Sequence, residues 1–154
     1  MNVTIRPAGP TDAARIHEVH VSSVRALCAP AYEHTVVDGW LKGRSAEGYL
    51  WGIAQGATFV AEASSGIVGF CEAVRGEVRA VFVEPGWAGQ GVGTFLLSHA
   101  LSVASGESSG PVRLESTLNA ITFYEHFGFR QINRATVRRN DVDVPIVIME
   151  RRAG

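Results

Sequence analysis

The stretch VEPGWAGQGVGTFLLSHA, residues 83–100, joins an apolar run to an amphipathic run through a glycine-rich turn. Four of the 17 glycines of the chain lie between positions 86 and 93. Glycine lets the backbone adopt a positive φ and lets a ligand approach the main chain closely. The first amides of a helix lack intrahelical partners and lie at the positive end of the helix dipole. The stretch therefore predicts a strand, a turn and a helix whose N-terminus binds a phosphate or pyrophosphate group.

Two common phosphate-binding patterns are excluded on this stretch. The nucleotide triphosphate loop needs a lysine after its second glycine, and although Gly86 and Gly91 have the correct spacing, Val92 follows them. The dinucleotide pattern needs a third glycine at position 94, which is Thr94, and no βαβ unit precedes it. On this stretch alone, a glycine-rich turn that binds no ligand stays open as an alternative.

Hydrophobic periodicity and turn residues predict the other elements of the chain. We expect helices at 11–29, 36–42, 46–54, 91–104 and 119–127, and strands at 3–7, 57–63, 66–74, 77–85, 111–117, 129–138 and 142–151. Thr11 is expected to cap the first helix, whose buried face is predicted from Ile16, Val19, Ser23 and Leu27.

The helix at 91–104 is expected to bury one apolar stripe, formed by Val92, Phe95, Leu96, His99 and Val103. Hairpins combined with a strand–helix–strand unit predict an α+β (mixed α/β) fold around one central sheet. The strand at 77–85 is expected to be central and covered on both faces. A chain of 154 residues fits one domain, which we expect to span 1–154.

The bulk composition is that of an ordinary globular protein, with 46% hydrophobic residues, 19% charged residues and a net charge of −1. This balance argues against nucleic acid or an anionic membrane as the main partner. Arg134, Arg138 and Arg139 are expected to form the solvated end of a hairpin. We expect a cytoplasmic protein, because the sequence shows neither a signal-peptide pattern nor an apolar run of about 18 residues.

The two cysteines, Cys28 and Cys71, are too few for a disulfide framework and have no metal-ligand spacing. We expect both to be small core residues and predict no metal site.

Two motifs together resemble a known family. VFVEPGWAGQGVG, residues 81–93, resembles the signature V-x-P-x-x-[RQ]-G-x-G-[IV]-G of the GCN5-related N-acetyltransferases, the GNAT superfamily. LNAITFYEHFGF, residues 118–129, resembles a slightly shortened form of its second signature, N-x-x-A-x-x-F-Y-E-x-x-G-F. Ala88 departs from the first signature, at the position usually held by arginine or glutamine. The resemblance covers nearly the whole chain except residues 30–56 and implies a central, mostly antiparallel, splayed sheet flanked by helices.

The resemblance implies acetyl-CoA, or another acyl-CoA, as co-substrate. The pyrophosphate would lie on the backbone amides of Gly89, Gln90, Gly91, Val92, Gly93 and Thr94. The pantetheine arm would pair with the strand at Val81, Phe82 and Val83, in a slot opened by a β-bulge and a splay from strand 111–117. Asn119 has two open roles, since it either caps the helix that follows it or contacts the CoA arm.

The implied reaction is direct attack of an amine on the thioester. Tyr124 would protonate the leaving thiolate, and its alternative role is that of a core aromatic residue. The proton of the amine would go to Glu72, Glu77, Glu84 or water, and the Val83 amide would stabilise the oxyanion. A covalent route through Cys71 is disfavoured, because no motif ties a histidine to it.

These expectations predict an N-acetyltransferase that acts on a primary amine of a small molecule or peptide. Among acyltransferases, the alternative is an enzyme that transfers another acyl group or uses an oxygen acceptor. Outside the enzymes, the alternative is a non-catalytic acyl-CoA sensor, which Ala88 favours and Tyr124 disfavours. Residues 30–56 are expected to form much of the acceptor pocket, but their mixed charges do not define the acceptor. A homodimer is an open alternative that no exposed apolar stripe requires.

Overall fold

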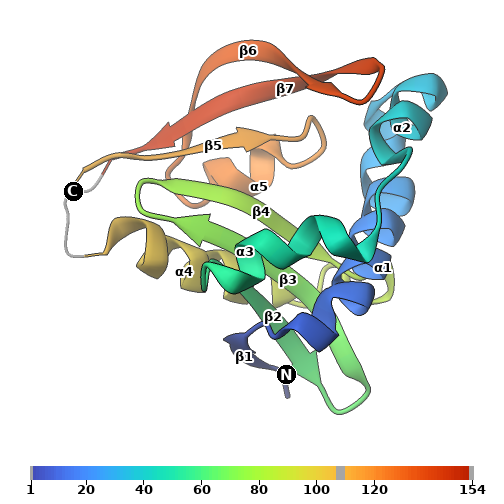
Figure 1. Cartoon of the computed structure of the whole chain (residues 1–154). Helices are drawn as coiled ribbons and strands as arrows, with labels where there is room; N and C mark the ends of the chain where they lie inside the picture. Colours follow the sequence, from blue (N-terminus) through green and yellow to red (C-terminus); the bar gives the residue numbers. More distant parts are fainter. Residues whose placement is uncertain (1, 107–109, 153–154) are drawn as a thin grey trace.

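A seven-stranded sheet runs through the computed structural model of the protein, which describes residues 2–106 and 110–152. The strand order is β1-β2-β3-β4-β5-β7-β6, and all neighbours are antiparallel except β4 and β5. The strands, shown in Figure 1, are β1 Thr4–Pro7, β2 Thr58–Ala63, β3 Gly66–Val74, β4 Glu77–Val83, β5 Val112–Ser116, β6 Arg130–Arg139 and β7 Val142–Arg151. The predicted α+β fold with a mostly antiparallel sheet is confirmed.

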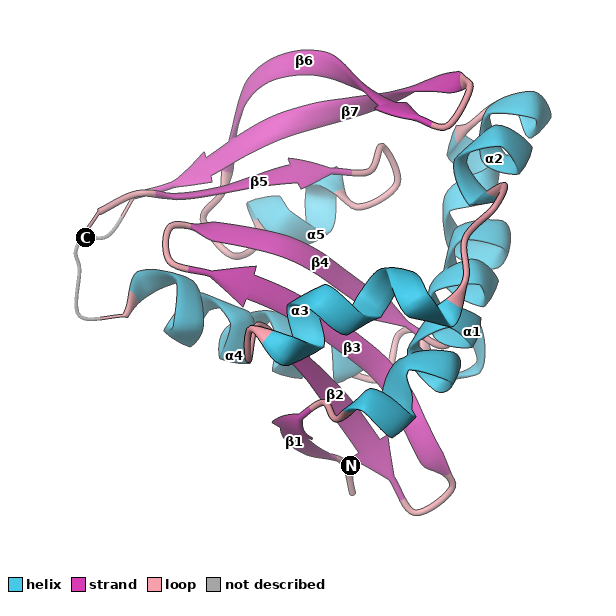
Figure 2. Cartoon of the chain, in the orientation of Figure 1, coloured by secondary structure: helices cyan, strands magenta, loops and turns pink. Residues whose placement is uncertain are grey.

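Helices cover both faces of the sheet (Figure 2). The α-helices are α1 Ala13–Ser23, α2 His34–Leu41, α3 Leu50–Ala54, α4 Val92–Ser105 and α5 Ile121–Glu125. Short helical turns accompany them, namely η1 Pro10–Asp12, η2 Val24–Cys28, η3 Ala29–Ala31, η4 Ala46–Tyr49 and η5 Pro85–Trp87. Helices α4 and α5 lie on one face, and α1, α2 and α3 lie on the other, so the crossover from β4 to β5 runs through α4.

Strand β4 is covered on both faces, as predicted. Val81 and Val83 pack on the α4 side of the sheet, whereas Ala80 and Phe82 pack on the α1 side. All four are only half-buried. Their residual exposure is explained by the cleft beside this strand, described below.

The buried stripe of α4 differs from the predicted one. It consists of Val92, Leu96, Leu97, Ala100, Leu101 and Ala104, while Phe95 keeps 39% of its surface exposed. Helix α4 lies so close to β3 that a Cβ on Gly69 would come within 2.8 Å of Leu96 Cδ1. Such a close approach favours alanine on the buried face of α4. A prediction based only on the large apolar side chains does not identify these alanine positions.

The first helix is also shorter than predicted. Helix α1 begins at Ala13, and a π-helical turn, η2, interrupts the α-helical pattern from Val24 to Cys28. Thr11 lies inside η1 and makes no capping hydrogen bond, so the predicted Thr11 cap is wrong. The Asp12 carboxylate instead accepts hydrogen bonds from the Gly9 amide and the Arg6 guanidinium, both at 2.8 Å. Arg6 also bonds Glu62, which ties η1 and β1 to β2.

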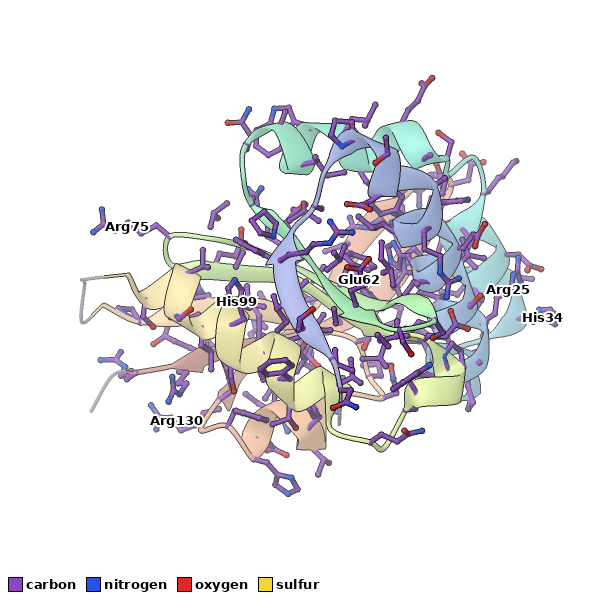
Figure 3. All side chains as sticks on the ribbon, turned by 90° about the horizontal axis from the view of Figure 1, so that it is seen from below. Arg25, His34, Glu62, Arg75, His99 and Arg130 are labelled. Carbon is purple, nitrogen blue, oxygen red and sulfur yellow. The ribbon has the colours of Figure 1, made fainter. Side chains whose placement is uncertain are left out.

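Charged side chains point outward from this framework. Figure 3 shows Arg25, His34, Arg75 and Arg130 projecting from the periphery. Among the described residues, no helix has the length and apolar character needed to cross a bilayer.

Candidate active site

Strands β4 and β5 touch at one end and then diverge. In the described part of the sheet, their pairing is limited to Glu77 opposite Arg113. The β3–β4 register shifts by one residue between the pairs Ala73–Val78 and Glu72–Ala80, which leaves Arg79 as the extra residue of a β-bulge. The predicted bulge and splay are therefore present. The bulge lies four residues before Val83.

The backbone of β4 presents hydrogen-bonding groups toward the slot. The Glu84 amide donates to the Val68 carbonyl oxygen at 2.8 Å, so Glu84 points toward β3. Because backbone groups alternate along an antiparallel strand, those of Phe82 also point toward β3, and those of Val81 and Val83 point toward the diverging β5. Val81 and Val83 thus offer an unpaired strand edge along the slot.

The glycine-rich turn forms a cluster of amide donors at the N-terminus of α4. Gly89 and Gly91 have φ values of 76° and 90°, which glycine adopts without strain. No backbone amide from residue 89 to residue 94 has a hydrogen-bond partner within the described ranges. Such a cluster at a helix N-terminus suits an anionic ligand.

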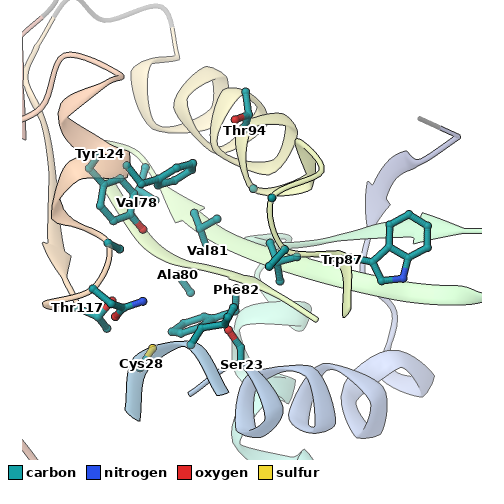
Figure 4. Close-up of a pocket in the computed structure, with 18 of the residues that line it drawn as sticks. Ser23, Cys28, Val78, Ala80, Val81, Phe82, Trp87, Thr94, Thr117 and Tyr124 are labelled. Atoms are coloured by element: carbon teal, nitrogen blue, oxygen red, sulfur yellow. The ribbon is translucent and has the colours of Figure 1, made fainter. Parts of the chain in front are cut away.

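A cleft of about 610 Å³ joins the slot to this turn (Figure 4). The predicted cofactor residues that line it are Val81, Phe82, Val83, Gly89, Gly91, Gly93, Thr94 and Asn119. Gln90 and Val92 do not line it. The Gln90 side chain turns back to the Gly86 carbonyl oxygen at 3.2 Å, and Val92 is buried in the core.

Asn119 belongs to the cleft and does not cap α5. The N-cap residue of α5 is Ala120, and it makes no side-chain capping hydrogen bond. Asn119 and Cys28 both line the cleft. Helix α5 ends at Glu125, two residues before the predicted end at Phe127. Gly128 follows with a φ of 87°, and its amide donates to the Glu125 carbonyl oxygen.

Tyr124 is a buried side chain whose hydroxyl faces the cleft (Figure 4). Its ring contacts Phe123 and Phe129 edge-on, which fixes the direction of the hydroxyl. In the described structure this hydroxyl has no hydrogen-bond partner. Burial raises the pKa of Tyr124 above its usual value, so the phenol keeps its proton at neutral pH. The residue thus combines a core aromatic ring with an available proton donor.

The three carboxylates expected as general bases do not line the cleft. Glu72 accepts a hydrogen bond from Thr58, Glu77 pairs with Arg79 at 2.9 Å, and Glu84 pairs with Arg15 at 3.1 Å. The carboxylate that does line the cleft is Glu115, which has no ion-pair partner within 4.0 Å among the described residues.

Glu115 was missed by the sequence analysis, although a signal for it exists. Val112, Leu114 and Ser116 of β5 are buried and alternate with the exposed Arg113 and Glu115. That alternation places Glu115 on the face opposite α4, at the end of β5 that has separated from β4. Recognising its proximity to the cleft requires the register of the splayed strands.

His20 and Tyr49 form a second unexpected feature. His20 is 7% exposed, and its Nδ1 atom lies 2.7 Å from the Tyr49 hydroxyl oxygen. Its ring lies 4.3 Å, centroid to centroid, from the ring of Phe82. Burial, aided by the nearby positive charge of Arg44, lowers the pKa of His20 to about 3. In the sequence, His20 follows Ile16 by four residues and so lies on the same face of α1. This spacing could have predicted that His20 is buried.

The two cysteines differ in position. Cys71 is fully buried on β3, and burial raises its pKa to about 12, which opposes formation of the nucleophilic thiolate. Cys28 lines the cleft, and burial raises its pKa to about 11. Among residues 2–106 and 110–152, no group of three or more histidine, cysteine or acidic side chains is arranged to hold a metal ion.

The acetyltransferase (GNAT) domain family matches residues 54–131 of the chain. A curated relative, peptidyl-lysine N-acetyltransferase YjaB from Salmonella typhimurium (strain LT2), is 34% identical over 70 residues. This match spans 46% of this chain and 47% of YjaB, about half the length of the relative.

Two solved structures resemble the whole fold. A GCN5-related N-acetyltransferase from Rhodopseudomonas palustris has a TM-score of 0.84 at 23% identity, covering 99% of this chain and 96% of that one. The PaiA N-acetyltransferase from Thermoplasma acidophilum, solved in complex with coenzyme A, has a TM-score of 0.78 at 22% identity, covering 99% of both chains. At these identities the likeness concerns the fold. The family match includes β4, the amide cluster at α4 and the Tyr124 helix described above, and the chain therefore belongs to the GNAT acetyltransferase family.

Proposed function

We propose that the protein is an N-acetyltransferase that transfers the acetyl group of acetyl-CoA to a primary amine of a small molecule or peptide by direct attack. One observation carries the proposal, namely that three features share a single cleft. These features are the unpaired amides of Gly89, Gly91, Gly93 and Thr94, the open backbone edge of β4 and the Tyr124 hydroxyl. Together they match a ligand with an anionic end, an amide-rich arm and a reactive tip.

The residues present fit acetyl-CoA, which supplies a thioester carbonyl and a thiol leaving group when it is bound. The amide cluster from Gly89 to Thr94 is suited to a pyrophosphate, because it offers unpaired donors at the positive end of α4. A Cβ on Gly93 would come within 3.5 Å of Phe123, so glycine keeps this part of the cleft open. Val81 and Val83 would pair with the pantetheine amides, and Val83 is also available to donate its amide hydrogen to the acyl oxygen.

Tyr124 would act as the general acid. Its hydroxyl faces the cleft and holds its proton, and it would donate this proton to the departing sulfur. Glu115 would act as the general base, directly or through a water, because it is the carboxylate that lines the cleft. The neutral amine would approach from the α1 side of the sheet, which is the side that Phe82 and Glu115 face.

Two comparisons support an N-acetyltransferase activity. The family is one of acetyltransferases, and the relative matched over half its length is named a peptidyl-lysine N-acetyltransferase. A non-catalytic acyl-CoA sensor remains the rival, because Ala88 contributes only a methyl group at the edge of the cleft. The position of the Tyr124 hydroxyl favours the enzyme.

The test has two steps. First, acetyl-CoA and CoA at millimolar concentration should raise the melting temperature, because a ligand that binds only the folded state stabilises it. Second, CoA release should be followed over a panel of primary amines. An unchanged melting temperature would overturn enzyme and sensor together, whereas binding without release for any amine would favour the sensor.

A further inference from the structure

The hydroxyl of Tyr32 joins two backbone segments that the sheet itself leaves unpaired. It accepts a hydrogen bond from the Leu118 amide at 3.0 Å and donates one to the Pro145 carbonyl oxygen at 2.7 Å. Leu118 lies in the turn between β5 and α5, and Pro145 lies in β7. Tyr32 follows η3, 86 residues before Leu118, so this bridge connects the segment after α1 to the edge of the cleft.

The bridge stands where the next pair of the β5–β7 ladder would be. The antiparallel pairing ends with Ser116 opposite Val147, and two steps further the same register would place Leu118 opposite Pro145. Proline has no N–H group, so it cannot complete the two-bond pair of an antiparallel ladder. The Tyr32 hydroxyl takes the place of a direct amide-to-carbonyl bond, and the chain then leaves the sheet and turns back into α5 (Figure 1).

The turn that Tyr32 holds carries part of the cleft wall. Thr117 and Asn119 line the cleft, whereas Leu118 between them packs into the core on the α4 side. The Ala120 amide donates to the Thr117 carbonyl oxygen, and the Tyr124 amide donates to the Ala120 carbonyl oxygen, both at 3.1 Å. Backbone hydrogen bonds therefore link this turn to the helix that carries the proposed general acid.

Tyr32 is itself held firmly outside the cleft. Its ring contacts the ring of Trp40 edge-on, with the centroids 5.5 Å apart, in the hydrophobic cluster that also contains Ile146. Burial raises the pKa of Tyr32 to about 12, so the phenol keeps the proton that it donates to Pro145. Tyr32 is not among the described residues that line the cleft, so any influence on the reaction has to pass through the turn.

We propose that Tyr32 is a positioning residue, which holds the turn at 117–120 and thereby directs the Tyr124 hydroxyl toward the leaving sulfur. The inference rests on the proposed N-acetyltransferase function and adds to it a residue outside the cleft. Without the bridge, the Leu118 amide and the Pro145 carbonyl oxygen would each lose a partner, and the turn would be free to shift. A displacement of about 1 Å is enough to slow a reaction that depends on aligned groups.

The first arm of the test measures the bridge and needs no substrate. Amide hydrogen exchange is followed by NMR in wild type and in Tyr32→Phe, which keeps the ring and removes the hydroxyl. We expect the Leu118 amide to exchange at least about tenfold faster in the variant. The Leu114 amide, in the paired part of β5, reports any change in overall stability, and the change at Leu118 is measured relative to it.

The second arm asks whether Tyr32 acts through Tyr124. Tyr32→Phe should lower kcat by about tenfold and leave the Kd of acetyl-CoA nearly constant. In the Tyr124→Phe background the same substitution should cost less than about twofold, because the hydroxyl that Tyr32 positions is already absent. An acyl donor with a more acidic thiol should reduce the Tyr32→Phe defect, since its leaving group needs less protonation.

Tyr49→Phe is the matched control. Tyr49 is also half-buried, and its hydroxyl makes a hydrogen bond of 2.7 Å, but with the side chain of His20. Tyr49 is not among the described residues that line the cleft. The control variant therefore loses a comparable bond at another place. Its kcat should stay close to the wild-type value, and any loss should be the same with and without the Tyr124 hydroxyl.

Three results would overturn the inference. Unchanged exchange of the Leu118 amide in Tyr32→Phe would mean that the hydroxyl does not hold the turn. An unchanged kcat, or a defect just as large in the Tyr124→Phe background, would mean that Tyr32 does not act through Tyr124. These three results leave the proposed function intact. Absence of acetyl transfer to every amine would overturn the proposed function and the positioning role with it, while hydrogen exchange would still report the bridge.

Discussion

The Nδ1 atom of His20 lies 2.7 Å from the hydroxyl oxygen of Tyr49, and the His20 ring packs against Phe82, which lines the cleft. With a pKa of about 3, this histidine stays neutral at physiological pH and is a poor proton acceptor. It therefore holds Tyr49 and Phe82 in place, and the role of general base is left to a carboxylate or to water.

The burial of His20 predicts a specific dependence of stability on pH. Its folded pKa of about 3 lies below the ordinary value of 6.5, so between these values the unfolded state binds more protons. The free energy of unfolding should therefore rise with pH through this window and fall as the pH drops from about 6 toward 4. The contribution of His20 should be on the order of 1 kcal/mol per pH unit.

Urea unfolding of wild type and His20→Gln at pH 4, 5 and 6 checks this prediction. The wild-type free energy should fall more steeply on acidification than that of the variant. His126→Gln, at an exposed position on the opposite side of the sheet, serves as the control and should keep the wild-type slope. Parallel slopes for all three proteins would show that His20 is accessible to protons in the folded state.

We predict that substitution of Gly93 causes a loss of CoA binding. Gly93→Val would place a branched side chain in the cleft next to Phe123, so the Kd of CoA should rise by at least about tenfold while the fold is retained. Gly91→Val is a less selective test, because a φ of 90° strains any β-branched residue. Gly86→Ala is the matched control, since Gly86 lies in the same turn with open space around it. Calorimetric titration with CoA decides, and normal binding by folded Gly93→Val would mean that this stretch is only a turn.

Tyr124→Phe should separate catalysis from packing. The substitution keeps the ring contacts with Phe123 and Phe129, and the lost hydroxyl has no partner among the described residues, so stability should change by about 1 kcal/mol or less. Turnover should fall roughly 10²-fold, the lower end of the contribution of a positioned proton donor. The Kd of acetyl-CoA should stay nearly constant, because the interaction belongs to the transition state.

The measurement is kcat with any accepted amine, repeated with an acyl donor whose thiol is more acidic. The defect should shrink with that donor, because its leaving group needs less protonation. A loss of less than about threefold would leave Tyr124 as a packing residue and water as the proton source.

Glu115→Gln tests the general base. If Glu115 takes the proton of the amine, kcat/KM at neutral pH should fall by roughly 10²-fold, with little change in the Kd of acetyl-CoA. Glu77→Gln is the control, because Glu77 is only partly buried, pairs with Arg79 and does not line the cleft. Equal activity of the two variants would assign deprotonation of the amine to water.

Local sequence was sufficient to predict the strand, glycine-rich turn and helix that would bind the cofactor. The glycines at 89, 91 and 93, the strand before them and the helix after them follow from backbone rules that act over a few residues. The placement of Tyr124 on a short helix that ends shortly before Gly128 follows from similar local signals. The alternation of apolar residues was likewise enough for an α+β fold with a central β4.

Tertiary structure alone decided which charged side chains border the cleft and which surround the β6–β7 turn. Arg139 was expected at a solvated hairpin end, but Asn140 fixes that turn to α2, and Arg139 becomes a half-buried neighbour of Arg44. Glu115 replaces Glu72, Glu77 and Glu84 as the cleft carboxylate because the splay of β5 sets which strand face borders the cleft. The physical reason is the range of the interactions. Turn geometry and helix termini depend on adjacent residues, whereas the charge lining a cavity depends on which distant segments pack together.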